Sequence, residues 1–398
     1  MKARWVVVAS LTAVALVAGG CSSSSSGGSS GGAEFHVLDI TALSGPLASI
    51  GTPETQATKA AVNYLNSLGG LSGRKIVLDV KDDQSDPSKA VSLVQQALTS
   101  GKKPDLVLPG VTSNETVALL PVLARSKVVS IATTGSAEIT NTAKYPLSFG
   151  ASFQPTDGPE SMATYLAKQN YKTVGILRAN DAFGASWFSN LSKSLAVRSL
   201  KAVSVTYDPT AIDLSPELGK LESEHPDVIV AEGFGAPVAA IYAARVKLGN
   251  YAIPLVADTT ISAGNPWKAA GNPAAFQNSV EQAYAVQEYK PAATQRPAVQ
   301  TMLTWVRKLG PLTAAISLYA GNWDLLQTAK AAVAKAGSQA STKLAQAMES
   351  LSAADAQWTQ NGGAPPGYTS AVHFAVSTPQ NFIYIKPGPL TDGMITAT

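Results

Sequence analysis

Two serines, Ser113 and Ser136, stand shortly after apolar segments of the chain, where their hydroxyls could bind an acid. The segments that precede them, 106–108 and 128–131, have the length and composition of strands. In an open α/β sheet, ligands lie beyond the carboxyl ends of the strands, where helix N-termini with free N–H groups favour an anion. The two hydroxyls therefore suit a carboxylate, although each could instead only cap the helix that follows it.

Residues that usually carry catalysis are few and scattered. His36, His225 and His373 lie far apart in the sequence, which argues against a histidine-based metal or acid–base site. The chain has no HExxH, GxxxxGK[ST] or GxGxxG motif. Segment 184–188 lacks the second glycine of a nucleophile elbow, and segment 233–238 lacks the third glycine of the dinucleotide fingerprint. We therefore expect no enzyme, no cofactor and no metal.

Length and composition bound the remaining possibilities. A chain of 398 residues exceeds what one hydrophobic core usually organises, which predicts two lobes. The 45% of hydrophobic and 14% of charged residues exclude both a disordered chain and a polytopic membrane protein. The net charge is +3, with Lys2 and Arg4 supplying two of the charges, so nothing favours nucleic acid as a partner. The single cysteine excludes an internal disulfide and a CxxC zinc site.

The N-terminus predicts export and a lipid anchor. Segment 1–20 has two positive charges and then a short apolar run, as a signal peptide does. Ala18-Gly19-Gly20-Cys21 resembles a bacterial lipobox, in which the cysteine receives the lipid. Segment 21–33 follows, and its serines and glycines from 22 to 32 form a flexible tether. An ordinary secretory signal with an incidental cysteine is the alternative.

Apolar strands alternate with helical stretches through the rest of the chain. One series comprises strands at 36–40, 76–80, 106–108 and 128–131, and a second comprises strands at 174–177, 202–205, 228–231 and 253–256. Helices are expected between them, for example at 54–68. This alternation predicts two α/β lobes, each with a parallel sheet covered on both faces.

The last third of the chain is expected to contribute elements to both lobes. Segment 284–286 predicts a strand, and the long helix 318–336 suggests a return to the first lobe. Segments 373–376 and 382–385 alternate or run apolar, and we expect them to form a terminal hairpin on the second lobe.

Several turns together carry a resemblance to a known family. They are Leu43-Ser44-Gly45-Pro46, Gly51, Leu68-Gly69-Gly70-Leu71-Ser72-Gly73-Arg74, Asp82-Asp83-Gln84-Ser85-Asp86-Pro87, Gly110-Val111-Thr112-Ser113 and Asn180-Asp181-Ala182-Phe183-Gly184. With these turns the chain resembles the type I periplasmic binding proteins of the leucine/isoleucine/valine-binding class, over essentially everything after residue 34. The resemblance implies two Rossmann-like lobes joined by three crossovers, with a ligand enclosed between them.

The resemblance also implies site residues. Ser113 and Ser136, with Thr134 and Gly135 beside the latter, take the place of the residues that bind the ligand carboxylate. Phe183 and Phe234 stand where the family often has aromatic walls. Thr259 replaces the acid that pairs with a ligand ammonium, and its neighbour Asp258, Asp181 or Glu232 could restore that charge. Ile50 occupies a position that is often aromatic. We therefore expect α-amino acids to bind less well than acids without an ammonium group.

The expected organisation is a first lobe of residues 34–152 and 285–350 and a second of 153–284 and 351–398, with crossovers near 153–154, 284–285 and 351–352. The expected function is a monomeric, extracytoplasmic lipoprotein that captures a small, carboxylate-bearing solute and delivers it to the permease of an ABC importer. A ligand-sensing lipoprotein of the same fold, a binder of an amide or polyol, and a hydrolase on the same fold are the alternatives.

Overall fold

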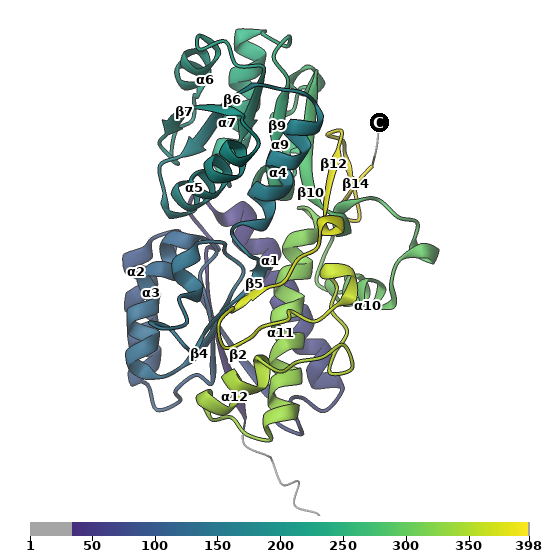
Figure 1. Cartoon of the computed structure of the whole chain (residues 1–398). Coiled ribbons are helices and arrows are strands. Elements are labelled where there is room, and N and C mark those ends of the chain that lie inside the picture. The colour runs from purple at the N-terminus through teal and green to yellow at the C-terminus, as the bar shows by residue number, and fades with distance from the viewer. Residues whose placement is uncertain (1–33, 397–398) are drawn as a thin grey trace, which may run out of the picture.

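The computed structural model describes residues 34–396, so the signal segment, Cys21 and the tether lie outside the described residues. Two lobes lie one above the other, and the chain passes between them on one side (Figure 1). Each lobe contains a sheet of six strands, with helices on both faces. The two-lobed α/β fold expected from the sequence is confirmed.

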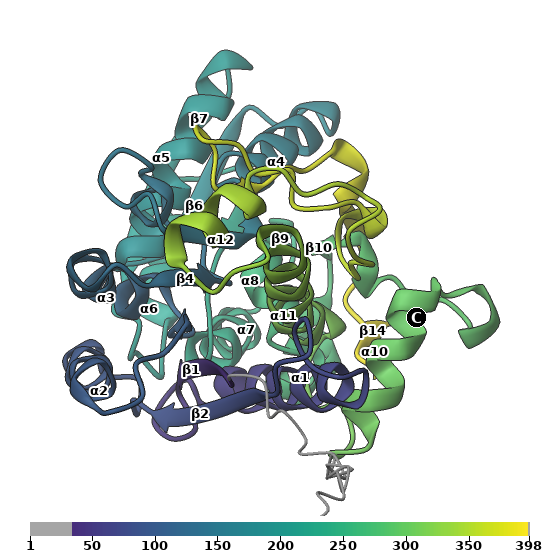
Figure 2. The ribbon, with the colours of Figure 1, turned by 90° about the horizontal axis from the view of Figure 1, so that it is seen from below.

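The first lobe is built on the sheet ordered β11-β5-β4-β3-β1-β2. Its strands are β1 (Phe35–Thr41), β2 (Ile76–Asp82), β3 (Leu106–Pro109), β4 (Val129–Ala132), β5 (Ser148–Phe153) and β11 (Phe374–Ala375). The helices of this lobe are α1 (Ala48–Ser67), α2 (Pro87–Thr99), α3 (Ser113–Ser126), α10 (Pro297–Arg307), α11 (Ile316–Ala336) and α12 (Ser341–Met348). Seen from below, α11 lies between α1 and α12 (Figure 2).

The second lobe is built on the sheet ordered β12-β10-β9-β8-β6-β7. Its strands are β6 (Thr173–Ala179), β7 (Lys201–Tyr207), β8 (Val228–Ala231), β9 (Leu255–Ala257), β10 (Ser279–Tyr284) and β12 (Phe382–Ile385). Its helices are α4 (Asp157–Lys168), α5 (Ala182–Val197), α6 (Ser215–Glu222), α7 (Ala236–Leu248), α8 (Thr259–Ala263) and α9 (Pro266–Ala270). A small hairpin of β13 (Leu390–Thr391) and β14 (Met394–Ile395) follows.

Both sheets are parallel except at one edge, where β12 runs antiparallel to β10. Every residue of β3, β4 and β8 is buried. Helices cover both faces of these strands, which is why their sequences are continuously apolar and do not alternate. The carboxyl ends of the central strands in both lobes face the space between the lobes (Figure 1).

The third crossover differs from the expectation. The chain leaves the first sheet after β5 and the second after β10, but it crosses for the last time between Ala375 and Phe382 and not near residue 351. The expected terminal hairpin is wrong, because β11 pairs with β5 in the first lobe and β12 pairs with β10 in the second. The expected strand at 284–286 is also displaced: β10 ends at Tyr284, and a 3₁₀ turn follows.

Contacts with β5 explain why β11 joins the first lobe. The ring of His373 stacks on Phe149 with 3.9 Å between the ring centroids, and its Nδ1 lies 2.9 Å from the carbonyl oxygen of Ser148. The Phe374 ring covers Gly150, where a Cβ atom would lie only 2.5 Å from it. Partners more than 200 residues away in the sequence therefore decide which sheet this strand enters.

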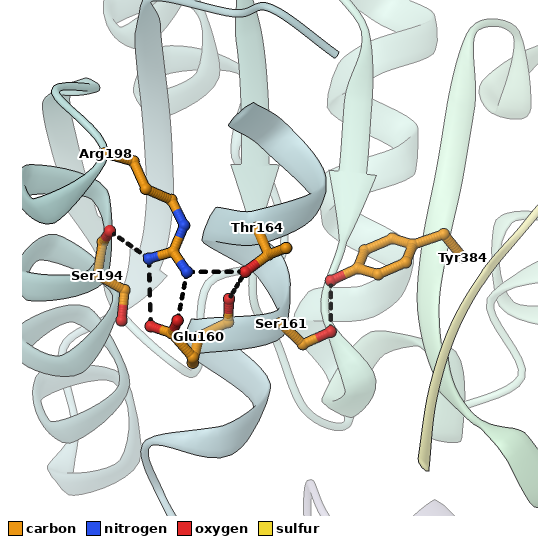
Figure 3. A network of polar contacts seen from close by, with 6 residues as sticks. All are labelled: Glu160, Ser161, Thr164, Ser194, Arg198 and Tyr384. Atoms are coloured by element: carbon orange, nitrogen blue, oxygen red, sulfur yellow. Dashed lines mark hydrogen bonds and ion pairs between the residues drawn. The ribbon is translucent and has the colours of Figure 1, made fainter. Parts of the chain in front are cut away.

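A polar network holds α4 between α5 and β12 in the second lobe (Figure 3). Arg198 forms an ion pair with Glu160 and donates to the hydroxyl of Thr164 at 2.8 Å. On the same helix, the Ser161 hydroxyl lies 3.1 Å from that of Tyr384, which belongs to β12. The strand that follows the last crossover is thus attached to the first helix of its lobe.

Candidate functional site

A cleft of about 360 Å³ lies between the two lobes. The first lobe contributes the loops after β3 and β4, the end of β5, and parts of α1 and α11. The second lobe contributes residues that follow β6, β7, β8 and β9, and the last residue of β10. The cleft therefore lies beyond the carboxyl ends of strands in both sheets, where an α/β fold presents helix N-termini to a ligand.

Six of the nine residues expected at the site line this cleft. They are Ser113, Thr134 and Gly135 from the first lobe and Phe183, Phe234 and Thr259 from the second. The structure therefore brings together residues that are up to 146 positions apart in the sequence.

The other three expected residues are not among the described residues that line the cleft. Ser136 is buried and directly precedes a 3₁₀ turn at Ala137–Thr140. Asp258 is fully buried, and its Oδ1 accepts hydrogen bonds from the backbone N–H groups of Thr260 and Ile261 at the start of α8. Ile50 faces the hydrophobic core of the first lobe. Their contact with a ligand stays a prediction, which the lining of the cleft does not support.

Ser113 opens α3 at the edge of the cleft. The residue is only 2% exposed, and its Oγ has no hydrogen-bond partner within the described chain. The loop before it is held by Glu115, whose Oε2 accepts hydrogen bonds from the N–H groups of Val111 and Thr112 at 2.9 and 2.8 Å. Glu115 therefore holds this loop through its backbone, and the Ser113 hydroxyl is left without a partner among the described residues.

The wall from the second lobe combines rings with two carboxyl groups. Phe183 lies in the first turn of α5, and Phe234 packs against the core of the first lobe. Asp181 and Glu232 also line the cleft, and each has one oxygen engaged: Asp181 accepts from the N–H of Gly184, and Glu232 from that of Ala179.

The two lobes touch at the rim of the cleft. Asn114 of α3 accepts a hydrogen bond of 3.1 Å from the N–H of Ala182 at the start of α5. A Cβ atom on Gly135 would lie 3.3 Å from the ring of Phe183, and one on Gly235 would lie 3.0 Å from the side chain of Leu47. The small residues at these points allow the lobes to approach each other.

One family model matches most of the chain. It is described as "Periplasmic binding protein", and it matches residues 38–378. The chain belongs to the periplasmic binding protein family. The resemblance to the leucine/isoleucine/valine-binding class is confirmed with it, because the curated relatives carry that name.

A relative named Leu/Ile/Val-binding protein homolog 3, from Brucella melitensis, is 27% identical over 201 residues. That match covers 50% of this chain and 54% of the relative, so the chain spans about half the length of the curated relatives it matches.

Solved structures share the fold of this binding protein over nearly its whole length. A type 1 periplasmic binding protein from Bordetella pertussis has a TM-score of 0.77 at 20% identity, covering 89% of this chain and 96% of that chain. An ABC-transporter solute-binding protein from Rhodopseudomonas palustris, solved in complex with 3,4-dihydroxybenzoic acid, has a TM-score of 0.69 at 18% identity, covering 80% and 86%.

Buried carboxyl groups surround the cleft of this binding protein. Burial raises the pKa of Glu54 and of Glu232 well above the usual value for glutamate, and nearby carboxylates raise both further. Burial also raises the pKa of Glu115 and of Asp258 to about 7. None of the described residues that line the cleft is a lysine, arginine or histidine. The described cleft lining therefore has no lysine, arginine or histidine to bind an anion, and burial favours the protonated form of several of its carboxyl groups.

These raised pKa values predict that the binding protein is less stable at alkaline pH. Burial raises the pKa of Asp39 and Asp324 to about 7 and that of Glu281 to about 8. Between the ordinary and the raised pKa, the folded chain holds a proton that the unfolded chain has released. The free energy of unfolding should therefore fall as pH rises through that range, by about 1.4 kcal/mol per pH unit for each such proton.

Melting temperatures measured from mildly acidic to mildly alkaline pH check this expectation. Glu281→Gln should make the decline shallower, because Glu281 is buried and its Oε1 has no partner among the described residues. Asp79→Asn applies the same kind of change to an exposed carboxyl and is the control. A melting temperature that rises with pH over this range would contradict the expectation.

Some residues that line the cleft could not be predicted from the sequence. Glu54 of α1, Ser317 of α11, Tyr284 at the end of β10 and Gln360 of the loop after α12 all line the cleft. Gln360 is positioned by Asp324, which accepts a hydrogen bond of 2.9 Å from its N–H. Nothing in the sequence marks these residues, because each is defined only by packing between segments that are distant in the chain.

No group of three or more histidine, cysteine or acidic side chains that could hold a metal ion occurs among residues 34–396. Within the same described range, none of the helices combines the length and the apolar character that crossing a membrane requires.

Proposed function

We propose that the protein captures a small solute with a carboxylate group between its two lobes and delivers it to an ABC importer. The observation that carries this proposal is the Ser113 hydroxyl, which is buried, has no partner within the described chain and opens a helix at the interlobe cleft. The N-terminus of a helix favours an anion. The family implies an extracytoplasmic location, and a monomer that contacts permease subunits fits this role.

The remainder of the ligand is proposed to be apolar or aromatic. Phe183 and Phe234 provide rings on the wall of the second lobe. A solute-binding protein with the same fold holds 3,4-dihydroxybenzoic acid, an aromatic acid without an ammonium group. Glu232 is kept neutral by burial and Asp258 lies behind the cleft wall, so neither offers an ammonium group a ready ion pair. We therefore rank acids without an ammonium group before α-amino acids.

A thermal-shift screen of the purified protein tests this function. The compounds are leucine, other amino acids, hydroxy acids, aromatic acids, amides and polyols. A ligand that binds only the folded state at 100 times its dissociation constant adds about 2.7 kcal/mol to the free energy of unfolding. Stabilisation by acids supports the proposal. Stabilisation by amides or polyols alone would contradict a carboxylate ligand, and strong binding of leucine would show that Asp181 or Glu232 pairs with its ammonium group.

We expect Cys21 to anchor the protein in the membrane through its lipid. Two acyl chains give stable anchoring where one chain is marginal, and the segment that follows Cys21 is a run of serine and glycine long enough to act as a tether. Cys21→Ala should therefore leave the protein in the soluble fraction or unprocessed. Ser22→Ala, at the neighbouring position, is the control and should remain in the membrane fraction. Equal membrane retention of both variants would contradict the assignment.

A further inference from the structure

Two long helices of the first lobe begin at the cleft, and each carries a serine in its first turn. Ser113 is the first residue of α3, and Ser317 is the second residue of α11. Their exposed fractions are 2% and 6%, and neither Oγ has a hydrogen-bond partner among residues 34–396. A buried hydroxyl without a partner costs about 1 to 3 kcal/mol. Because both residues also line the cleft, a ligand atom there could complete their hydrogen bonding.

The surroundings of the two hydroxyls restrict what that ligand atom can be. Helices of 14 and 21 residues direct their N-terminal N–H groups and the positive ends of their dipoles toward this part of the cleft. Because no lysine, arginine or histidine is among the described lining residues, an anion here depends on hydroxyl and N–H donors. A carboxylate has two oxygens that accept hydrogen bonds, so one carboxylate can accept a hydrogen bond from each of the two hydroxyl groups.

Glu54 is a third polar group on this wall. It belongs to α1, is 5% exposed, lines the cleft and forms a side-chain hydrogen bond with Asn322 of α11. Burial raises its pKa well above the usual value for glutamate, and the nearby charges of Asp39 and Glu115 raise it further. The positive charge of Lys59 lowers the pKa of Asp39 and is not among the causes of the shift at Glu54. Burial therefore favours the protonated form of Glu54, whose O–H is a hydrogen-bond donor.

We propose that Ser317 binds the carboxylate of the ligand together with Ser113, and that the neutral Glu54 carboxyl donates a further hydrogen bond to the same group. This inference rests on the proposed function, because it requires a ligand with a carboxylate. It assigns that carboxylate to the part of the cleft lined by Ser113, Ser317 and Glu54, and not to Ser136. It also links binding to a proton, since a charged Glu54 would repel the ligand carboxylate.

Titration calorimetry on the purified protein tests the role of Ser317. The ligands tested are leucine, benzoate and 3,4-dihydroxybenzoate, and each acid is compared with its primary amide in a separate titration. For the acid that binds, Ser317→Ala should raise the dissociation constant about tenfold, the lower end of the range for a hydrogen bond to a charged group, because Ser113 and Glu54 share that carboxylate. Ser148→Ala is the matched control: Ser148 is another buried serine of the first lobe whose Oγ has no partner among the described residues, but it does not line the cleft.

The pH dependence of the same titrations tests the role of Glu54. The wild type should bind the acid more weakly at mildly alkaline than at mildly acidic pH. Glu54→Gln should make that difference smaller, because the amide keeps a donor that does not ionise. The part that remains is assigned to Glu115, which also lines the cleft and whose pKa burial raises to about 7. Unchanged binding in Ser317→Ala, or the wild-type pH dependence in Glu54→Gln, would overturn the inference while leaving the proposed function intact. Binding of amides but of none of the acids would overturn both.

Discussion

Replacing Ser113 with alanine is expected to raise the dissociation constant for a carboxylate ligand by about 10- to 150-fold. This range corresponds to about 1.5 to 3 kcal/mol, the usual contribution of a hydrogen bond to a charged group. The Ser113 hydroxyl lies at the start of α3, is 2% exposed and has no partner within the described residues that could take over its role. Under the proposed function, its loss removes a hydrogen bond to the ligand that no other group is known to replace.

Titration calorimetry with the acid found in the thermal-shift screen measures this effect. Ser113→Thr keeps the hydroxyl and should restore most of the affinity, whereas a purely structural serine would tolerate alanine better than the larger threonine. Ser148→Ala should bind like the wild type, since Ser148 lies outside the cleft lining. Wild-type affinity in Ser113→Ala would show that the carboxylate is bound elsewhere or that the ligand is not an acid.

Gly51→Ala is expected to destabilise the fold by about 2 kcal/mol, which lowers the melting temperature by roughly 4 to 8 °C. A Cβ atom at this position would lie 2.2 Å from the carbonyl oxygen of Ala42, where the chain has just left β1. Overpacking against backbone costs about 3 kcal/mol, because the oxygen cannot rotate away. Removing a glycine from a helix recovers only about 1 kcal/mol, so the clash dominates.

Thermal unfolding of the purified protein checks this value against a second glycine. A Cβ atom on Gly101, which is exposed, would have no atom within 4 Å. Gly101→Ala should therefore change the melting temperature little. If Gly51→Ala lowered it no further than Gly101→Ala, the close approach of α1 to the end of β1 would not contribute to stability.

The strands in the centre of both sheets could be predicted from the sequence because they are buried on both faces. Segments such as 106–108 and 228–231 are short, continuously apolar and bounded by turns, and they are found in β3 and β8. The edge strand β11 could not be assigned in the same way. It pairs over only two residues, Phe374 and Ala375, and its place depends on the contacts of His373 with Phe149 and Ser148.

Some residues of the candidate site could likewise be predicted from the sequence, and others could not. Ser113, Phe183 and Phe234 follow strands or begin helices, so their positions at the carboxyl ends of strands could be predicted. Ser136 and Asp258 also follow strands, yet neither is among the described residues that line the cleft. A strand end restricts a residue to one edge of a sheet but does not set the direction of its side chain.

The sequence by itself determined that this protein has two α/β lobes, because the periodicity of its strands and helices is a local property. Its turn motifs carry the resemblance to the periplasmic binding proteins, and that resemblance implied a ligand cleft between the lobes. Only the tertiary structure decided which side chains face the cleft and which carboxyl groups are neutral. Glu54 and Ser317 are 263 positions apart and line the same cleft because α1 packs against α11. The burial that raises the pKa of Glu54 arises only when distant segments of the chain pack together.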